Sequence, residues 1–366
     1  MTGYDASVST PQLHIVGARP NFMKAAPVVS ALGEIGRQPY LVHTGQHYDA
    51  AMSEIFFEQL NMPQPDRNLG VGSGSHAAQT AALMIALEEL FEEMRPQLIV
   101  VYGDINSTLA AAVTAAKLRI PVAHVEAGLR SFDRTMPEEV NRVVTDALSS
   151  LHFTTSPEAE EHLLKEGISA KGIHFVGNPM IDTLLRFRDV LDIEGARRLF
   201  DLPERYAVAT LHRPSNVDED LAAGRVVEGL RRVAKELPIL LPLHPRGQEV
   251  LFRQGLTNAD GISVTEPIGY LEFMALMSGA ALVLTDSGGI QEETTVLGVP
   301  CLTLRDNTER PITVTMGTNR LVGNDPEVIE SAAIEFVASP PMGRVPPLWD
   351  GSAGPRIARV IADLGG

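Results

Sequence analysis

Short apolar runs alternate with amphipathic, helix-like segments along almost the whole chain, and this pattern restricts the possible folds more than any other feature. The runs have the length of buried strands and lie at residues 13–17, 97–103, 121–127, 151–156, 206–213, 238–244, 281–287 and 300–305. Regular alternation of this kind is typical of parallel sheets with crossover helices. The sequence therefore predicts an α/β fold, in which ligands bind beyond the carboxyl ends of the strands.

The chain is long enough for two domains. Its 366 residues, of which 44% are hydrophobic, exceed the size of one ordinary domain of about 150 residues. A second series of strands and helices begins after Gly177-Asn178-Pro179. We therefore predict two Rossmann-like, doubly wound domains that face a central cleft, at residues 11–179 and 180–350.

The two ends of the chain fall outside these domains. Residues 1–10 are expected to be a mobile tail, and they lack the charged and apolar regions of a signal peptide. Residues 340–354 resemble a linker before a final helix at 355–364, within a C-terminal segment at 351–366. The sequence contains no apolar run of the length needed to cross a membrane, so we expect a cytoplasmic location.

Charge and cysteine content exclude several classes of protein. A formal net charge of −16 argues against nucleic acid or an anionic membrane as the main partner, because both require an extended positive field. The single cysteine, Cys301, excludes an internal disulfide. Its apolar neighbours predict a packed strand residue rather than a nucleophile.

A strand at residues 282–285 runs into Asp286, Ser287, Gly288 and Gly289 and then opens a helix. The glycine pair allows backbone to approach an anion closely, and a helix N-terminus favours negative charge. We interpret the segment as a phosphate-binding turn. Glu292 and Glu293 follow one turn later and are suited to accept from sugar hydroxyls. The alternative is a tight turn followed by a solvated, acidic first helical turn.

Basic side chains follow several predicted strands of this acidic protein. The basic set consists of Arg19 and Lys24 near the end of the first strand, Arg142 on a predicted helix, and Arg213, Arg246 and Arg310. Guanidinium groups suit a diphosphate, because each can donate two hydrogen bonds to neighbouring oxygens. For any one of them, an ordinary surface ion pair is the alternative.

Four carboxylates form a second candidate group: Asp104, Glu126, Glu138 and Glu139. Carboxylates that meet in one site raise one another's proton affinity, which suits an acid/base pair that works near neutral pH. The alternative for the two glutamates after Pro137 is a helix-dipole role. Arg142, one turn after Glu138, could pair with it.

Among the histidines, His212 and His244 each follow an apolar strand and stand beside arginine and proline. His212 could act as an acid/base or as a phosphate donor, and a core histidine with one satisfied nitrogen is the alternative. We interpret His43 and His124 as structural. The sequence contains no His-Glu-x-x-His motif of a catalytic zinc site, so we predict no metal.

Several segments together resemble the UDP-N-acetylglucosamine 2-epimerase family, and the match spans nearly the whole chain. They are Gly17–Lys24, Tyr102–Asp104, His124–Arg130, Pro137–Arg142, Asp286–Glu293 and Thr308–Pro311, in the family's order and spacing. The resemblance implies a glycosyltransferase-B-like architecture with UDP in the cleft, a last helix that returns to the N-terminal domain, and a homodimer.

The resemblance also implies chemistry without metal or redox cofactor. A base removes the proton at sugar C2 while UDP leaves C1, which gives 2-acetamidoglucal, and UDP then re-adds with proton delivery to the opposite face. By position, Asp104, Glu126 and Glu138 are the implied acid/base groups, with His212 near the leaving diphosphate. The implied ligand contacts are Arg19, Lys24, Arg142 and Arg310 for anion and sugar, His244 and residues 287–289 for the phosphates, and Glu293 for the ribose.

The chain departs from the pattern of relatives that bind a second, activating UDP-N-acetylglucosamine. Among the positions that bind the activator in those relatives, this chain clearly retains only Gln46 and Arg213. At the other positions, Asp49 and small residues replace the cationic or amide side chains that would donate to the second nucleotide. We therefore expect no obligatory substrate activation. The open alternatives are a 2-epimerase for a modified sugar such as a 2,3-diacetamido uronate nucleotide, the hydrolysing branch, a glycosyltransferase of the same fold, and a nucleotide-sugar-binding protein without catalysis.

Overall fold

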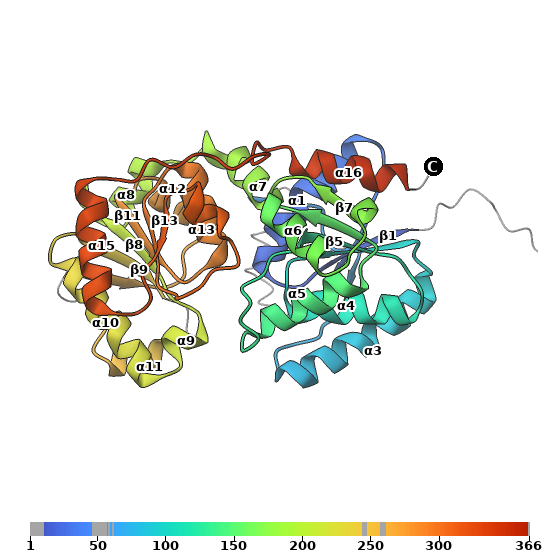
Figure 1. The fold of residues 1–366 in the computed structure, drawn as a ribbon, viewed down its shortest axis with the longest axis horizontal. Coiled ribbons are helices and arrows are strands. Elements are labelled where there is room, and N and C mark those ends of the chain that lie inside the picture. The colour runs from blue at the N-terminus through green and yellow to red at the C-terminus, as the bar shows by residue number, and fades with distance from the viewer. Residues whose placement is uncertain are drawn as a thin grey trace, which may run out of the picture. The chain divides into compact units, whose positions relative to one another are not determined.

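In the computed structural model the chain forms two compact α/β units (Figure 1). The structure describes residues 11–45, 57, 59–60, 62–243, 247–256 and 261–364. Unit 1 consists of residues 1–183 together with 347–366, and unit 2 consists of residues 184–346. Each unit has its own parallel sheet, and helices connect successive strands. This confirms the predicted α/β class with two doubly wound sheets.

The sheet of unit 1 has seven parallel strands in the order β3-β2-β1-β4-β5-β6-β7. Their bounds are β1 Gln12–Val16, β2 Tyr40–His43, β3 Arg67–Asn68, β4 Leu98–Tyr102, β5 Val122–Ala127, β6 Leu151–Thr154 and β7 Ile173–Phe175. The central strands are buried along their whole length, as expected for strands covered on both faces. The strand order reverses between β1 and β4, which is the position where such sheets bind ligands.

The helices of unit 1 are α1 Arg19–Glu34, α3 His76–Met94, α4 Asn106–Lys117, α5 Pro137–Leu148, α6 Pro157–Lys165 and α16 Ala353–Asp363, with a 3-10 turn at Ala170–Gly172. Helix α7, Pro179–Arg188, begins in unit 1 and ends in unit 2. The last helix, α16, packs against α1 (Figure 1). Oδ2 of Asp182 accepts from the backbone N–H of Gly354 at 2.7 Å and so satisfies a donor at the start of α16.

The sheet of unit 2 has six parallel strands in the order β10-β9-β8-β11-β12-β13. Their bounds are β8 Ala207–Thr210, β9 Ile239–Pro242, β10 Ile262–Thr265, β11 Leu282–Thr285, β12 Cys301–Thr303 and β13 Asn319–Leu321. Cys301 is fully buried, and burial raises the pKa of its thiol to about 12, which agrees with the predicted packing role. Here the order reverses between β8 and β11.

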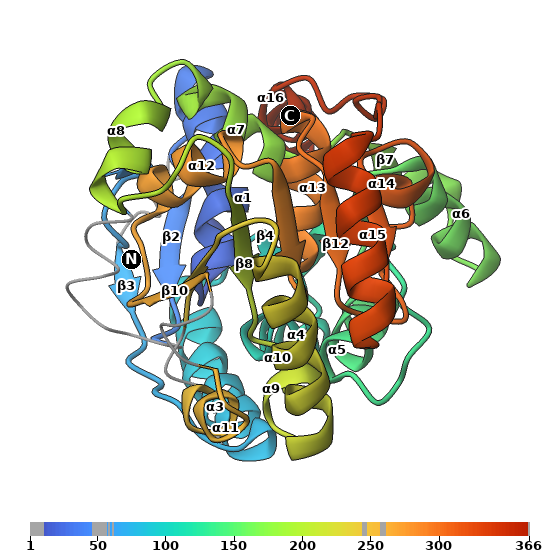
Figure 2. The same cartoon turned by 90° about the vertical axis from the view of Figure 1, so that its left-hand side faces the viewer.

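The helices of unit 2 are α8 Ile193–Leu199, α9 Pro214–Val217, α10 Asp220–Ala234, α11 Gln248–Arg253, α12 Tyr270–Ser278, α13 Gly288–Leu297, α14 Ile312–Thr315 and α15 Pro326–Ala338. Apolar faces of α10 and α15 close one side of the core, and Figure 2 shows both helices on the viewer's side of this sheet. Among the described residues, no helix is both long enough and apolar enough to cross a membrane.

The structure also describes the segments that the sequence analysis assigned to linkers. The boundary between the two units lies within α7, between Thr183 and Leu184, whereas the sequence analysis placed it after Pro179. Within the segment read as a linker, Trp349 is buried and its Nε1 donates to the carbonyl of Thr155 at 2.8 Å. That part of the segment is therefore anchored to unit 1. Residues 1–10 lie outside the described residues.

Candidate active site

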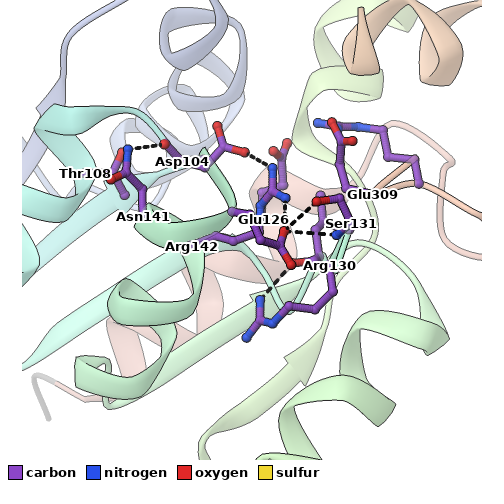
Figure 3. A network of polar contacts seen from close by, with 12 residues as sticks. Asp104, Thr108, Glu126, Arg130, Ser131, Asn141, Arg142 and Glu309 are labelled. Atoms are coloured by element: carbon purple, nitrogen blue, oxygen red, sulfur yellow. Dashed lines mark hydrogen bonds and ion pairs between the residues drawn. The ribbon is translucent and has the colours of Figure 1, made fainter. Parts of the chain in front are cut away.

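Asp104 lies at the end of β4, in the turn that leads to α4. The preceding residue, Gly103, has φ +62°, and a Cβ atom there would lie 2.9 Å from Nζ of Lys24. Glycine is therefore required both for the backbone conformation and for the close approach of the lysine. The carbonyl of Asp104 accepts from Nδ2 of Asn141 at 2.9 Å, and its carboxylate pairs with Arg142 (Figure 3).

Glu126 lies at a bulge in β5. Its φ is +74°, and the register with β6 shifts between Val125 and Ala127. A non-glycine residue in this left-handed region costs about 1–2 kcal/mol, and such strain is typical of functional sites. Its Oε1 accepts from Nζ of Lys24 at 2.8 Å, and both side chains are almost fully buried. Lys24, which the sequence analysis predicted as a ligand contact, pairs with Glu126 in this structure.

Arg142 on α5 joins Asp104 to a second acidic residue. Its Nη2 pairs with Asp104 and its Nη1 with Glu139, and the Arg142 side chain is 2% exposed. Glu139 also accepts from the backbone N–H of Ser131 and of Phe132, at 2.9 Å each. The guanidinium is thus fixed between two carboxylates, one of which holds the turn after β5 (Figure 3).

The sequence analysis did not identify this role of Glu139. Glu139 stands in the first turn of α5, as the helix-dipole reading requires. That reading was incomplete, because the carboxylate also accepts from the turn after β5 and pairs with Arg142. The i,i+3 spacing of Glu139 and Arg142 was the available signal. Glu138, the neighbouring candidate, is partly exposed in the same helical turn.

In unit 2, His212 and Asp286 follow the adjacent strands β8 and β11. The carboxylate of Asp286 is fully buried and accepts from the backbone N–H of His212 at 3.1 Å and of Arg213 at 3.0 Å. Nδ1 of His212 lies 2.9 Å from Oδ1 of Asp286. Burial alone would raise the pKa of Asp286, but the charge and hydrogen bonds of His212 and the Arg213 amide hold it below its usual value.

This carboxylate orients the imidazole of His212. An ionised Asp286 only accepts, so Nδ1 of His212 carries a proton and Nε2 is the second functional nitrogen. The side chain of His212 is 48% exposed, so the ring is accessible to a ligand. The buried structural role considered as the alternative for His212 is wrong.

Glu309 gathers three arginines near the start of α13. It pairs with Arg305 at 2.7 Å, Arg310 at 2.5 Å and Arg213 at 3.4 Å, and its own side chain is 1% exposed. A Cβ atom at Gly288 would lie only 2.3 Å from Nη1 of Arg310. The guanidinium of Arg310 therefore packs directly on the first residue of α13. Sequence reasoning missed Glu309, whose only signal was its place between arginines at 305 and 310.

The two glutamates of α13 are buried, so the solvated acidic turn considered as an alternative is wrong. Oε1 of Glu292 lies 2.9 Å from Nε of Arg310. Burial raises the pKa of Glu293 to about 8, the charge of Glu292 adds to the rise, and a hydrogen bond from Tyr270 opposes it. Burial therefore favours the protonated form of Glu293. Ser287 donates its backbone N–H to Oγ1 of Thr285 at 3.0 Å.

Several candidates cannot be placed in this geometry. His244, Arg246, Gln46 and Asp49 lie outside the described residues, as does the side chain of Arg19, whose backbone begins α1. His43 and His124 are buried and hydrogen-bonded, which agrees with their structural reading. In the described part of the chain, no group of three or more His, Cys, Asp or Glu side chains is arranged to hold a metal ion.

Comparison with known proteins identifies the family. The family model described as UDP-N-acetylglucosamine 2-epimerase matches residues 32–362. The UDP-N-acetylglucosamine 2-epimerase of Methanocaldococcus jannaschii is 42% identical over 357 residues, which cover 95% of this chain and 97% of that protein. The chain belongs to the UDP-N-acetylglucosamine 2-epimerase family.

Family members of known structure share its fold. A crystal structure of the Methanocaldococcus jannaschii UDP-GlcNAc 2-epimerase in complex with UDP-GlcNAc and UDP matches with a TM-score of 0.90 at 42% identity, and the match covers 96% of this chain and 99% of that one. The UDP-2,3-diacetamido-2,3-dideoxy-D-glucuronate 2-epimerase of Pseudomonas aeruginosa is 41% identical over 358 residues, 96% of this chain and 99% of that protein. The family resemblance found in the sequence is confirmed, and the chain is similar to epimerases of two different sugars.

Proposed function

We propose that the protein catalyses non-hydrolysing epimerisation at C2 of UDP-N-acetylglucosamine, which gives UDP-N-acetylmannosamine. The observation that supports this most directly is the arrangement of Asp104 and Glu126 in unit 1. Asp104 follows β4, Glu126 lies in the bulge of the adjacent strand β5, and each is paired with its own buried cation, Arg142 or Lys24. A protein that only binds an anionic nucleotide has little use for clustered carboxylates.

The proposed reaction has two balanced steps. In the first, a carboxylate takes the proton from C2, the C–H electron pair forms the C1–C2 double bond of 2-acetamidoglucal, and the C1–O bond breaks to release UDP. In the second, a UDP oxygen attacks C1, and an acid delivers a proton to the opposite face of C2. The chemistry requires two proton-transferring groups and cations for the leaving diphosphate. We assign the proton transfers to the set Asp104, Glu126 and Glu138.

The nucleotide is assigned to unit 2. His212, Arg213 and Arg310 supply donors and positive charge for the diphosphate, since Asp286 leaves Nε2 of His212 as the nitrogen for the ligand. Residues 287–289 supply the start of α13 for a phosphate, and Glu293 receives the ribose. Arg19, Lys24, Arg142 and His244 complete the proposed ligand set by family position.

The experiment is incubation of the protein with UDP-N-acetylglucosamine in deuterated water, followed by proton NMR of the sugar. The proposal predicts deuterium at C2 and UDP-N-acetylmannosamine at an equilibrium ratio. Free N-acetylmannosamine with UDP would instead assign the protein to the hydrolysing branch. UDP binding without any change in the sugar would rule out this substrate.

A second candidate substrate is supported by the nearly equal identity to the Pseudomonas aeruginosa enzyme. Epimerases of both sugars face the same C2 chemistry, so the carboxylates and cations of the site fit either one. The same NMR experiment with UDP-2,3-diacetamido-2,3-dideoxy-D-glucuronate distinguishes them. A larger kcat/KM for the uronate would make it the substrate.

We also propose a homodimer without obligatory activation by a second nucleotide sugar. Light scattering should give twice the 39.5 kDa mass of one chain. The initial rate should rise hyperbolically with UDP-N-acetylglucosamine. A sigmoidal curve that Gln46→Ala converts to a hyperbola would contradict the second part.

A further inference from the structure

A buried histidine connects the two strand ends that bear Asp104 and Glu126. His124 lies on β5, two residues before Glu126, and is fully buried. Its Nδ1 lies 2.6 Å from Oδ1 of Asp146, and its Nε2 lies 2.8 Å from the carbonyl oxygen of Gly103, the residue before Asp104. The imidazole therefore joins β5 to the turn that presents Asp104.

Asp146, on α5, holds the other side of the β5 bulge. Its Oδ2 accepts from the backbone N–H of Gly128 at 3.0 Å and from Nη1 of Arg130 at 2.7 Å. Gly128 is two residues beyond Glu126, so the Asp146–His124 pair holds the chain on both sides of the strained residue. Arg130 is itself held by Glu166 through two bonds of 2.8 and 2.6 Å.

The hydrogen bonds fix the orientation of the imidazole. Burial alone would raise the pKa of Asp146, but the charge and hydrogen bond of His124 and those of Arg130 keep it below its usual value. The carbonyl of Gly103 can only accept, so Nε2 of His124 donates to it. Nδ1 is bound to the carboxylate of Asp146.

We propose that His124 and Asp146 are positioning residues that set the relative placement of Asp104 and Glu126 for proton transfer at C2. The inference rests on the proposed function. Both side chains are fully buried and act through the Gly103 carbonyl and the Gly128 amide, so they are not catalytic residues. Loosening this pair lowers kcat, because misplacement of a catalytic group by about 1 Å can cost 10²-fold. It leaves the binding of UDP by unit 2 unchanged.

Two amide substitutions separate the contacts of the imidazole. His124→Gln retains a donor near the position of Nε2, toward Gly103, whereas His124→Asn retains one near Nδ1, toward Asp146. We expect the Gln variant to keep kcat within about tenfold of the wild type and the Asn variant to lose about 10²-fold. Both should bind UDP, measured by calorimetry, within about twofold of the wild type.

A measurement independent of turnover tests the hydrogen bond to Gly103. In protein labelled with ¹⁵N-histidine, Nε2 of residue 124 should show the shift of a protonated nitrogen, in a resonance that His124→Gln removes. An unprotonated Nε2 would overturn the link between β5 and the turn before Asp104. The positioning role would be overturned if the Asn variant had the same kcat as the wild type. It would also be overturned if the Asn and Gln variants lost kcat to the same extent and melting temperature to the same extent. A wild-type protein without C2 exchange would instead contradict the proposed function.

Discussion

Nζ of Lys24 lies 2.8 Å from Oε1 of Glu126, and the two side chains are 5% and 1% exposed. A pair buried to this extent is costly to break by removal of one member. The pair also joins α1 to β5 across 102 positions of sequence. It therefore links the stability of unit 1 to the carboxylate that we assign to proton transfer.

Lys24→Met should destabilise the protein by about 3–5 kcal/mol, because breaking a buried pair by removing one partner is costly. The double variant Lys24→Met/Glu126→Gln should regain a large part of that loss, since it removes both charges of the pair. Denaturant unfolding of the wild type, both single variants and the double variant measures the coupling. Strict additivity of the two single effects would show that the pair contributes no coupling.

Asp104→Asn should lower kcat by about 10²–10⁴-fold, because the amide cannot exchange the C2 proton. UDP affinity should stay within about tenfold, or 1.4 kcal/mol, since the nucleotide is assigned to unit 2. The measurements are C2 exchange by NMR and UDP binding by calorimetry. Glu161→Gln, a change at an exposed residue of α6, is the control and should match the wild type in both. Wild-type turnover by the Asp104 variant would remove this residue from the mechanism.

Gly288→Ala should weaken UDP binding by about tenfold, equivalent to 1.4 kcal/mol. The added methyl group would lie 2.3 Å from Nη1 of Arg310 and 2.7 Å from Oε1 of Glu309, so the arginine must leave the start of α13. Gly33→Ala is the matched control, because a Cβ atom there meets no atom within 4 Å. Calorimetric titration with UDP compares them. Unchanged affinity in the Gly288 variant would show that this guanidinium does not contribute to nucleotide binding.

The raised pKa of Glu293 predicts a specific pH dependence of stability. Its pKa rises from 4.5 to about 8 on folding, so between these values the native state binds the extra proton. The stabilisation that protonated Glu293 contributes to the native state is fully present below pH 4.5. It falls as the pH rises above 4.5 and is lost once the pH has passed 8. Glu293→Gln should reduce this slope by up to about 1.4 kcal/mol per pH unit.

Denaturant unfolding at intervals from pH 5 to pH 9 measures the effect on the free energy of unfolding, using wild type and Glu293→Gln in parallel. Glu34→Gln changes an exposed carboxyl at the end of α1 and should leave the wild-type curve unaltered. Parallel curves for the wild type and the Glu293 variant would contradict the raised pKa.

The sequence predicted the parts of the site that depend on local pattern. Asp104, His212 and Asp286 stand directly after apolar runs, and runs of that kind become parallel strands whose carboxyl ends form a ligand-binding edge. The conformation of Glu126 could not be predicted in this way. Its positive φ arises from the bulge against β6, which is a property of the assembled sheet.

The pairing of charges was not predictable, because it joins residues far apart in sequence. Arg142 contacts Asp104 across 38 positions, and Arg213 contacts Glu309 across 96. Propensity and spacing give no information on which carboxylate a buried cation will meet. The pairing of Lys24 with Glu126, across 102 positions, was for this reason not predicted.

The return of α16 to α1 has a consequence for synthesis of the chain. Unit 1 is built from two separate stretches of sequence, with all of unit 2 between them. The ribosome must therefore synthesise all of unit 2 before residues 347–366 can emerge and cover α1. Until then, the carboxylate of Asp182 lacks the backbone N–H of Gly354 as its hydrogen-bond donor. The domain translated first is the last to be finished, and its exposed α1 face is the surface that a chaperone would have to protect.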